Sequence, residues 1–345
     1  MEGVARGLVT MTTVLITGAT GFVGSHILEA LTGKAGIKAV AVCRDKTRLL
    51  PEFTGEVREG DLRDAGFRKA VVQGVDTLCN ALAWSSLWGN VENSRRLFLE
   101  PNLALIEAAR AAGVRRFINT STTSAAAPER SSDPDSRGIP RPLWPHLCNV
   151  VRIEDALREA AGPDFQVVNL RLGIFAGRRY ALGVLPILIP RLKTHFVPWV
   201  AGGHTGLPMI DGRDIGQAFA YAVTASRLAD YESFNIVGSE IPTVREVIDF
   251  LHDEYGLPKP HFGVPFAIAY PFAWLMEKLD PIVPWEPLVT RSIIHLLEET
   301  GADNVKAERL LGYRPTHPWR EAIHVQMREM AARQTRPMSM ARPIA

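Results

Sequence analysis

The sequence predicts an α/β protein built on a doubly wound parallel sheet, with a smaller C-terminal lobe. In the first half of the chain, continuous apolar runs alternate with amphipathic helical patterns. Such alternation is typical of parallel strands covered by helices on both faces. A glycine-rich turn follows the first apolar run, as in nucleotide-binding sheets. After about residue 175 the pattern becomes irregular, which indicates a second lobe.

The expected elements follow from the hydrophobic periodicity and from the turn residues that end each run. Strands are expected at 13–18, 38–44, 57–62, 75–83, 115–124, 165–173 and 234–238. Helices are expected at 23–33, 65–74, 100–113, 146–161, 214–225 and 243–256. The last helix begins with Thr243 and, three residues later, Glu246, the arrangement of a capping box.

This pattern divides the chain into four parts. Residues 1–10 are predicted to be a disordered extension. Residues 11–175, with parts of 205–240, are predicted to form a dinucleotide-binding domain. Residues 176–330 are predicted to form a discontinuous substrate-binding lobe, and 331–345 a disordered tail.

Composition excludes several classes of protein. The net charge of +2 gives no electrostatic case for binding nucleic acid. The three cysteines lie far apart, so neither a metal site nor a disulfide framework is expected. No signal peptide is evident, and we expect a cytoplasmic protein. The apolar run 262–276 is too short to span a membrane and is expected to form core or pocket wall, with contact to a membrane surface as the alternative.

The segment "TGATGFVG" places Gly18, Gly21 and Gly24 between a buried strand and a helix. Gly18 would allow a tight turn, Gly21 would let the backbone approach a pyrophosphate, and Gly24 would let the helix pack closely on the strand. The N–H groups at the start of that helix would bind the phosphates. The segment therefore predicts dinucleotide binding in a Rossmann-type domain.

Two charged positions bear on the adenosine end of this cofactor. Arg44 follows the second strand, where an arginine suits the 2′-phosphate of NADP and an acidic residue suits NAD. Asp45 is its neighbour, so NADP is favoured and NAD stays open. Asp61 ends the third strand, where its carboxylate could accept a hydrogen bond from the adenine amine.

Several further segments carry a family resemblance, among them "GDLRD", "VDTLCNALA", "EPNLALIEAARAAGVRRFINTSTTSA" and "KAERLLGYRPTHPWREAI". With the glycine array they resemble the extended short-chain dehydrogenase/reductases of the NAD-dependent epimerase/dehydratase superfamily, over nearly the whole of 13–330. The most similar branch is that of 3β-hydroxysteroid dehydrogenase and dihydroflavonol reductase. The resemblance implies an oxidoreductase with a Rossmann domain, a substrate lobe and a homodimer through the helices near 102–112 and 147–160.

The resemblance also implies which residues hold the cofactor. They are Gly18, Thr20, Gly21, Phe22, Val23, Gly24, Arg44, Asp61, Leu62, Asn80, Ala81 and Thr120.

Members of the family work with a Ser or Thr, a Tyr and a Lys, in which the Tyr exchanges a proton with the substrate oxygen. Thr122 matches the Ser/Thr position, and Asn102 matches an asparagine that supports the site. Alignment on "RIEDAL" places His146 at the Tyr position and Val150 at the Lys position. No Tyr-x-x-x-Lys stands at this place in the sequence. His146 is therefore the candidate acid/base, with Tyr180 as a further stand-in.

The resemblance places a pocket rich in aromatic residues beside this site, which suits an apolar or aromatic small molecule. Its predicted lining is Trp84, Ser85, Trp88, Thr123, Trp144, Gly173 and Tyr180. Arg178, Arg179 and Arg191 leave open a basic clamp for a diphosphate.

Three functions fit these observations. The first is an NADP-dependent reductase or dehydrogenase acting on a carbonyl or imine. The second is a redox-neutral cyclase, isomerase, dehydratase or lyase on the same scaffold, which the loss of Tyr and Lys favours. The third is a non-catalytic dinucleotide sensor.

Overall fold

A computed structural model describes residues 11–126, 130–180, 184–280, 282, 287, 289–298 and 301–334. It confirms the predicted fold class: a seven-stranded sheet with the order β10-β6-β5-β4-β1-β2-β3, in which all neighbouring pairs are parallel. Its strands are β1 Thr12–Ile16, β2 Ile37–Cys43, β3 Glu56–Glu59, β4 Thr77–Asn80, β5 Arg116–Thr122, β6 Gln166–Leu172 and β10 Tyr231–Ile236.

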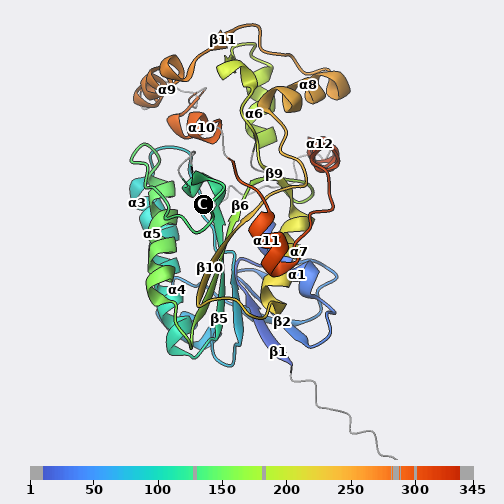
Figure 1. Ribbon diagram of the computed structural model, residues 1–345. Coiled ribbons are helices and arrows are strands. Elements are labelled where there is room, and N and C mark those ends of the chain that lie inside the picture. The colour runs from blue at the N-terminus through green and yellow to red at the C-terminus, as the bar shows by residue number, and fades with distance from the viewer. Residues whose placement is uncertain are drawn as a thin grey trace, which may run out of the picture.

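Helices cover both faces of this sheet, as Figure 1 shows. One face packs against α1 (Phe22–Leu31), α7 (Gly212–Thr224) and α11 (Val305–Leu311). The other face packs against α2 (Ala65–Val71), α4 (Glu100–Ala111) and α5 (Pro145–Ala160). The chain winds to one side of β1 through β2 and to the other side through β4. In such sheets, ligands bind outside the carboxyl ends of the strands at this switch point.

The helix predicted at 100–113 is longer than its sequence pattern indicates. It begins with α3 (Val91–Ser94) and continues through a π-helical turn, Arg95–Leu99, into α4. The extension was not predicted because Pro101 is unfavourable inside a regular α-helix. The π-helical turn before it changes the local hydrogen-bond pattern, so the helix can continue. The capping box at Thr243 is confirmed, since its hydroxyl accepts from Glu246 N at 3.1 Å and its N–H donates to the Glu246 carboxylate at 2.7 Å.

The rest of the chain forms helices and short strands beyond the carboxyl end of the sheet (Figure 1). The helices are α6 Val184–Leu192, α8 Val244–Tyr255, α9 Phe266–Leu279, α10 Arg291–Leu296 and α12 Trp319–Gln334. The short strands are β7 Ile174–Ala176, β8 Trp199–Val200, β9 Met209–Asp211 and β11 Gly263–Val264. They pair as β7 with β9 and β8 with β11. The segment of α6 was expected to be irregular, but it is helical and contains Pro190 within the helix.

The expectation that 262–276 forms core or pocket wall is wrong for most of its side chains. Helix α9 buries Ala269 and Ala273, while Ile268, Phe272 and Trp274 are 45–58% exposed. Two alanines suffice to pack the helix onto a small cluster, so its large side chains point outward. Within the described residues, no helix is both long and apolar enough to cross a membrane.

Candidate active site

The glycine loop has the geometry of a phosphate cradle. Gly18 adopts φ +59°, and a Cβ there would lie 2.3 Å from the carbonyl oxygen of Ala81. A Cβ on Gly24 would lie 2.2 Å from the carbonyl oxygen of Gly18, so α1 meets the turn at a distance that only glycine permits. Gly21 is the N-cap of α1, and no side chain caps this helix start. The N–H groups of α1 are thus suited to bind an anion, and these residues fit a dinucleotide.

The neighbouring predicted cofactor residues lie around this loop. Phe22 packs against Phe175 and Tyr180, with ring centroids 5.3 and 4.5 Å apart. Val23 is buried, and Thr20 is partly buried. The hydroxyl of Tyr180 is desolvated, which raises its pKa to about 12. Tyr180 is therefore placed against the start of α1, and its pKa disfavours a role as the proton donor.

The adenosine end of the predicted site carries charged side chains of both signs. Arg44 is exposed immediately after β2. The carboxylate of Asp45 accepts hydrogen bonds from the N–H of Thr47 at 3.0 Å and from its hydroxyl at 2.6 Å, which lowers the pKa of that carboxyl. Asp61 forms an ion pair with Arg63, which likewise lowers the pKa of Asp61. Leu62 beside it is buried.

A row of buried amides crosses the sheet beneath the site. Asn80 of β4 donates to Asn102 of α4 at 2.7 Å and to Asn119 of β5 at 3.2 Å. Asn119 donates to Asn169 of β6 at 2.9 Å. The three strand residues are direct register partners. Asn80 and Asn102 therefore hold the carboxyl end of β4 in place, which is a structural role that spacing alone did not reveal.

Two further residues complete this edge. Ala81 donates its N–H to the hydroxyl of Thr17 at 3.0 Å, which fixes the chain beside Gly18. Thr120 donates its hydroxyl to the carbonyl oxygen of Asn80 at 2.8 Å.

Thr122 is the last residue of β5, at the carboxyl edge of the sheet. It is partly buried, and its Oγ1 accepts a hydrogen bond from the N–H of Ser124 at 3.3 Å, so its hydroxyl hydrogen can point elsewhere. Thr123 is buried against the C-terminal lobe, and the neighbouring Ser124 carbonyl lies 3.1 Å from His295 Nε2. A hydroxyl at this position can donate to a substrate oxygen.

His146 is the second residue of α5 and packs between aromatic rings. Its ring centroid lies 4.6 Å from that of Phe98 and 6.2 Å from that of Trp84. Burial lowers the pKa of His146 to about 4, so the imidazole is neutral at pH 7. Val150, one turn further on, is buried in the apolar cluster on that face of the sheet.

Two polar residues that sequence reasoning missed orient this histidine. Nδ1 of His146 lies 3.5 Å from Oγ of Ser94, and Asn149 Nδ2 donates to the same Oγ at 2.9 Å. Because Ser94 Oγ already accepts a hydrogen bond from Asn149, its own hydroxyl hydrogen can be donated to His146 Nδ1. The proton of the neutral imidazole then lies on Nε2. Asn149 follows His146 by three residues on a predicted helix, a spacing that could have indicated it.

Several predicted pocket residues lie where the C-terminal lobe meets the loop after β4. Trp144 is buried and donates its Nε1–H to Ser86 O at 2.7 Å. Trp88 donates its Nε1–H to Asp280 Oδ2, at the end of α9, at 3.2 Å. Trp84 is partly buried and Ser85 is exposed. The Trp88 indole therefore fastens the lobe to this loop, whereas the Trp144 indole joins the loop to the start of α5.

Gly173 has a packing role, because a Cβ on it would lie 2.0 Å from the carbonyl oxygen of Pro208.

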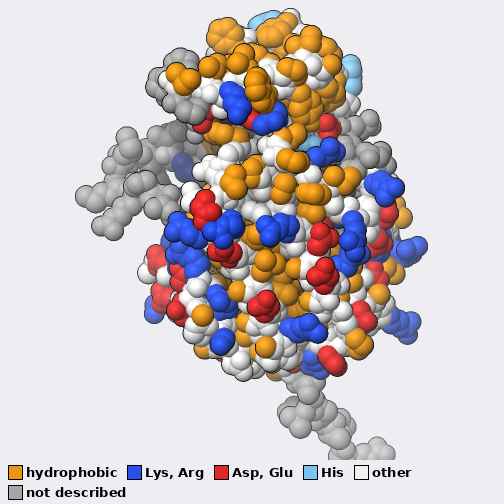
Figure 2. All heavy atoms as spheres, turned by 90° about the vertical axis from the view of Figure 1, so that its left-hand side faces the viewer, with side chains coloured by type: hydrophobic (Ala, Val, Ile, Leu, Met, Phe, Trp, Pro, Cys, Tyr) orange, Lys and Arg blue, Asp and Glu red, His pale blue; other side chains and the backbone are white. Residues whose placement is uncertain are grey.

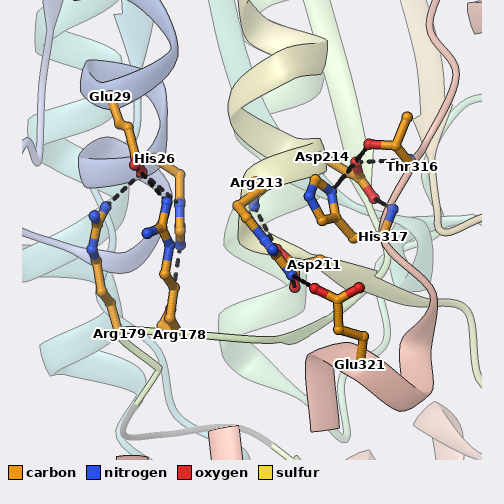
Figure 3. Close-up of polar contacts among 10 residues, drawn as sticks. All are labelled: His26, Glu29, Arg178, Arg179, Asp211, Arg213, Asp214, Thr316, His317 and Glu321. Carbon is orange, nitrogen blue, oxygen red and sulfur yellow. Dashed lines mark hydrogen bonds and ion pairs between the residues drawn. The ribbon is translucent and has the colours of Figure 1, made fainter. Parts of the chain in front are cut away.

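The candidate arginine clamp is engaged in ion pairs and backbone contacts. Figure 3 shows Glu29 of α1 facing Arg178 and Arg179, at 2.5 and 3.0 Å. Arg191 donates to the carbonyl oxygens of Ile187 and Pro287. These three arginines thus fasten segments of the chain to one another.

Figure 3 also shows how the final segments are attached. Arg213 bridges Asp211 and Glu321, at 2.9 Å to each. The carboxylate of Asp214 accepts a hydrogen bond from the N–H of Thr316 at 3.0 Å and lies 2.8 Å from His317 Nδ1. These contacts join α12 and the segment before it to α7.

Comparison with known proteins decides the family. Residues 14–237 match the model of the NAD dependent epimerase/dehydratase family. The chain belongs to this family. The family membership confirms both the resemblance to extended short-chain dehydrogenase/reductases and the prediction of an enzyme of the NAD(P)-dependent oxidoreductase type. Membership in the family indicates NAD or NADP as the cofactor, without a choice between the two.

Curated relatives within this family cover most of the chain. A 4-hydroxy-2-methyl-3-oxo-4-farnesyl-3,4-dihydroquinoline-1-oxide ketoreductase of Stigmatella aurantiaca is 25% identical over 88% of this chain and 92% of that protein. Sterol demethylase protein B of Methylococcus capsulatus is 27% identical over 88% and 94%. A 3-diazoavenalumate denitrifying reductase of a Streptomyces species is 27% identical over 90% and 98%.

Solved structures agree in fold. The crystal structure of gox2253 has a TM-score of 0.72 at 22% identity and covers 93% of this chain and 98% of that one. UDP-glucuronic acid 4-epimerase from Bacillus cereus, in complex with UDP-glucuronic acid and NAD, has a TM-score of 0.69 at 18% identity and covers 93% and 99%.

Proposed function

We propose that the protein is an NADP-dependent reductase acting on a carbonyl or imine of an apolar or aromatic small molecule. The observation that carries the proposal is the environment of His146, which the sequence alignment matches to the family's tyrosine. It is a neutral imidazole held by Ser94 and backed by aromatic rings. A neutral imidazole can polarise a carbonyl through its N–H, much as a phenol does.

Separate groups would bind the substrate oxygen, supply the hydride and orient the imidazole. His146 donates a hydrogen bond from Nε2 to the substrate oxygen, and Thr122 donates a second one from its hydroxyl. A bound NADP supplies the hydride. Because neutral imidazole is a very weak acid, the proton that ends on the substrate oxygen comes from water and not from His146. Ser94 and Asn149 position the imidazole by fixing its tautomer.

The preference for NADP rests on charge at the end of β2. Arg44 is exposed, and the Asp45 carboxylate beside it is engaged by Thr47. That engagement leaves a guanidinium as the group suited to meet a 2′-phosphate.

The preference for an apolar substrate rests on the indoles of the pocket loop and on the engaged arginines. The relatives named as a ketoreductase and as a sterol demethylase protein carry names that indicate lipophilic compounds, which supports the same class here. Nucleotide sugars are disfavoured because Arg178 and Arg179 are paired with Glu29.

A redox-neutral reaction is the second candidate. It is favoured by Val150, a buried residue that the sequence alignment matches to the lysine that holds the ribose in the family. In that case the substrate would be converted without net loss of NADPH.

The first test follows NADPH consumption with a panel of apolar aromatic ketones and imines. We expect turnover that falls about 100-fold in His146→Ala, since it loses one hydrogen bond to the developing oxyanion. Thr122→Val should lower kcat by a similar factor. Conversion of a substrate at constant NADPH would select the redox-neutral reaction instead, and NADPH binding without conversion would select the sensor.

The pH profile tests the protonation state assigned to His146. Its pKa is lowered to about 4, so the neutral ring is present throughout the range above that value and is lost only as the pH falls toward 4. We therefore expect kcat/KM for the best substrate to stay level from about pH 6 to about pH 8, as far as His146 determines it. A proton donor working as imidazolium would instead give a tenfold fall per pH unit across that range, which would contradict the assignment.

Binding titrations test the cofactor preference, with energy transfer from tryptophan to the reduced nicotinamide as the signal. We expect Arg44→Ala to weaken NADPH binding about 10- to 100-fold, because a charged hydrogen bond contributes about 1.5–3 kcal/mol. Binding of NADH should change little. Arg48→Ala, four residues further along the same exposed segment, is the matched control. Equal loss of both cofactors in Arg44→Ala would contradict the role.

A further inference from the structure

The outer side of the C-terminal lobe carries a concentration of exposed apolar side chains, which we call the α9 face. In Figure 2 hydrophobic side chains gather at the top of the molecule, whereas acidic and basic side chains intermingle lower down. Its members are large apolar residues that are 45–68% exposed. They are Phe196, Phe262, Ile268, Phe272, Trp274 and Leu275.

The α9 face follows from how the helix packs. Ala269 and Ala273 lie one turn apart and are almost fully buried, against a cluster that includes Val200 and Ile294. Ile268, Phe272 and Leu275 share a neighbouring, exposed side of the helix, at the spacing of an amphipathic stripe. A surface that contacts only water would carry polar residues in that stripe. The apolar composition of the stripe therefore indicates that it contacts something besides water.

Charged side chains in the segments that carry the α9 face are mainly basic. The segments 191–196 and 258–279 contain a single acidic residue, Glu277, and its carboxylate is bound by Arg291 at 2.7 Å. The exposed ionisable side chains of these segments that flank the apolar ones are Lys193, His195, His261 and Lys278. Apolar and aromatic side chains with a cationic border match the surface of an anionic bilayer, where tryptophan and lysine lie at the level of the headgroups.

We propose that the α9 face binds the surface of an anionic lipid bilayer, with α9 lying in the plane of the interface. A second copy of this chain fits less well, because a symmetric contact would bring the two cationic borders together. The binding proposed here is independent of the proposed reduction, although the two surfaces adjoin. Asp280, which follows α9, accepts the indole N–H of Trp88 in the loop after β4.

Flotation with vesicles tests this proposal. Purified full-length protein is mixed with vesicles of phosphatidylcholine or of phosphatidylcholine with phosphatidylglycerol. We expect it to float with the mixed vesicles and to be released as salt increases. The double variant Phe272→Ser/Leu275→Ser should lose binding by at least about tenfold, since it removes two large apolar side chains that would be buried in the interface. Lys278→Glu should weaken binding to the anionic vesicles alone.

Matched variants keep the test decisive. Val91→Ser/Val305→Ser removes two side chains with exposures of 63% and 66% outside the α9 face, and it should bind like the wild type. All variants change exposed positions, so their unfolding midpoints should stay close to that of the wild type, and these midpoints are the check on folding.

Two results would overturn the proposal. One is equal flotation of wild type and Phe272→Ser/Leu275→Ser. The other is a wild-type dimer in sedimentation that the same double variant converts to a monomer, without vesicle binding by either. That second result would assign the α9 face to contact between copies of the chain.

Discussion

Replacing Gly18 by alanine is expected to abolish NADPH binding and to lower the free energy of unfolding by about 3 kcal/mol. Two costs add. A residue with a Cβ loses about 1–2 kcal/mol in the left-handed region, where Gly18 has φ +59°. Forcing a Cβ to within 2.3 Å of Ala81 O costs a further 1–3 kcal/mol or so, because something must shift.

The carbonyl of Ala81 has little freedom to move away. The N–H of the same residue is bonded to Thr17 Oγ1, and the Thr17 hydroxyl donates to Asn80 at 2.9 Å. A shift would therefore disturb the end of β4 and widen the turn that is suited to the pyrophosphate. Urea unfolding and the NADPH titration measure the two effects separately.

Gly33→Ala is the matched control for this prediction. Gly33 has a similar positive φ of +74°, but nothing lies within 4 Å of the position its Cβ would occupy. We expect a loss of only about 1 kcal/mol and unchanged NADPH binding, because the backbone cost remains and the collision does not. If both alanine variants bind NADPH like the wild type, the close approach at Gly18 has no role in the site.

The fold and the glycine loop could be predicted from sequence because their causes are local. A buried parallel strand needs a continuous apolar run, and a helix that starts against a strand needs glycine where the backbones meet. Those rules indicated β1, α1 and the role of Gly18 without any knowledge of tertiary contacts. The strand expected at 115–124 is present as β5, although it ends two residues earlier, at Thr122.

Other features depend on contacts between distant segments. The composition of 262–276 indicates burial, but the lobe offers α9 only the small cluster that contains Val200. The pairing of Ser94 with His146 joins α3 to α5, and no periodicity relates them. Asn80 was predicted to bind cofactor, yet its amide also begins a row that runs through Asn119 and Asn169. Such a row becomes visible only when the strand register is known.

Removing the carboxylate of Glu154 is expected to have the largest effect on stability of any single change here, about 3–5 kcal/mol. Glu154 and Arg171 form an ion pair whose side chains are 3% and 0% exposed. Oε1 of Glu154 also accepts from Ser121 Oγ at 2.6 Å and from Asn169 Nδ2 at 2.9 Å. In Glu154→Leu the guanidinium of Arg171 would keep its charge inside the protein without a counter-ion, which chemical denaturation should detect as a large loss.

A second variant separates the ion pair from its surroundings. In Glu154→Leu/Arg171→Met neither charge is buried, so we expect most of the lost stability to return, because apolar side chains of similar volume often replace a buried pair at little cost. Asn169 would still lack one acceptor, so recovery should stop short of the wild type. If the double variant is no more stable than Glu154→Leu, the carboxylate acts mainly as the acceptor for Ser121 and Asn169.

The two outcomes differ in what they imply for the site. Asn169 connects Glu154 to Asn119, which in turn accepts from Asn80 at the carboxyl end of β4. If the ion pair alone matters, the double variant restores NADPH binding together with stability, since the amide row is intact from Asn80 to Asn169. If the acceptor at Glu154 orders the row, NADPH binding stays weak even where stability returns, because the support beneath the glycine loop is lost at its far end.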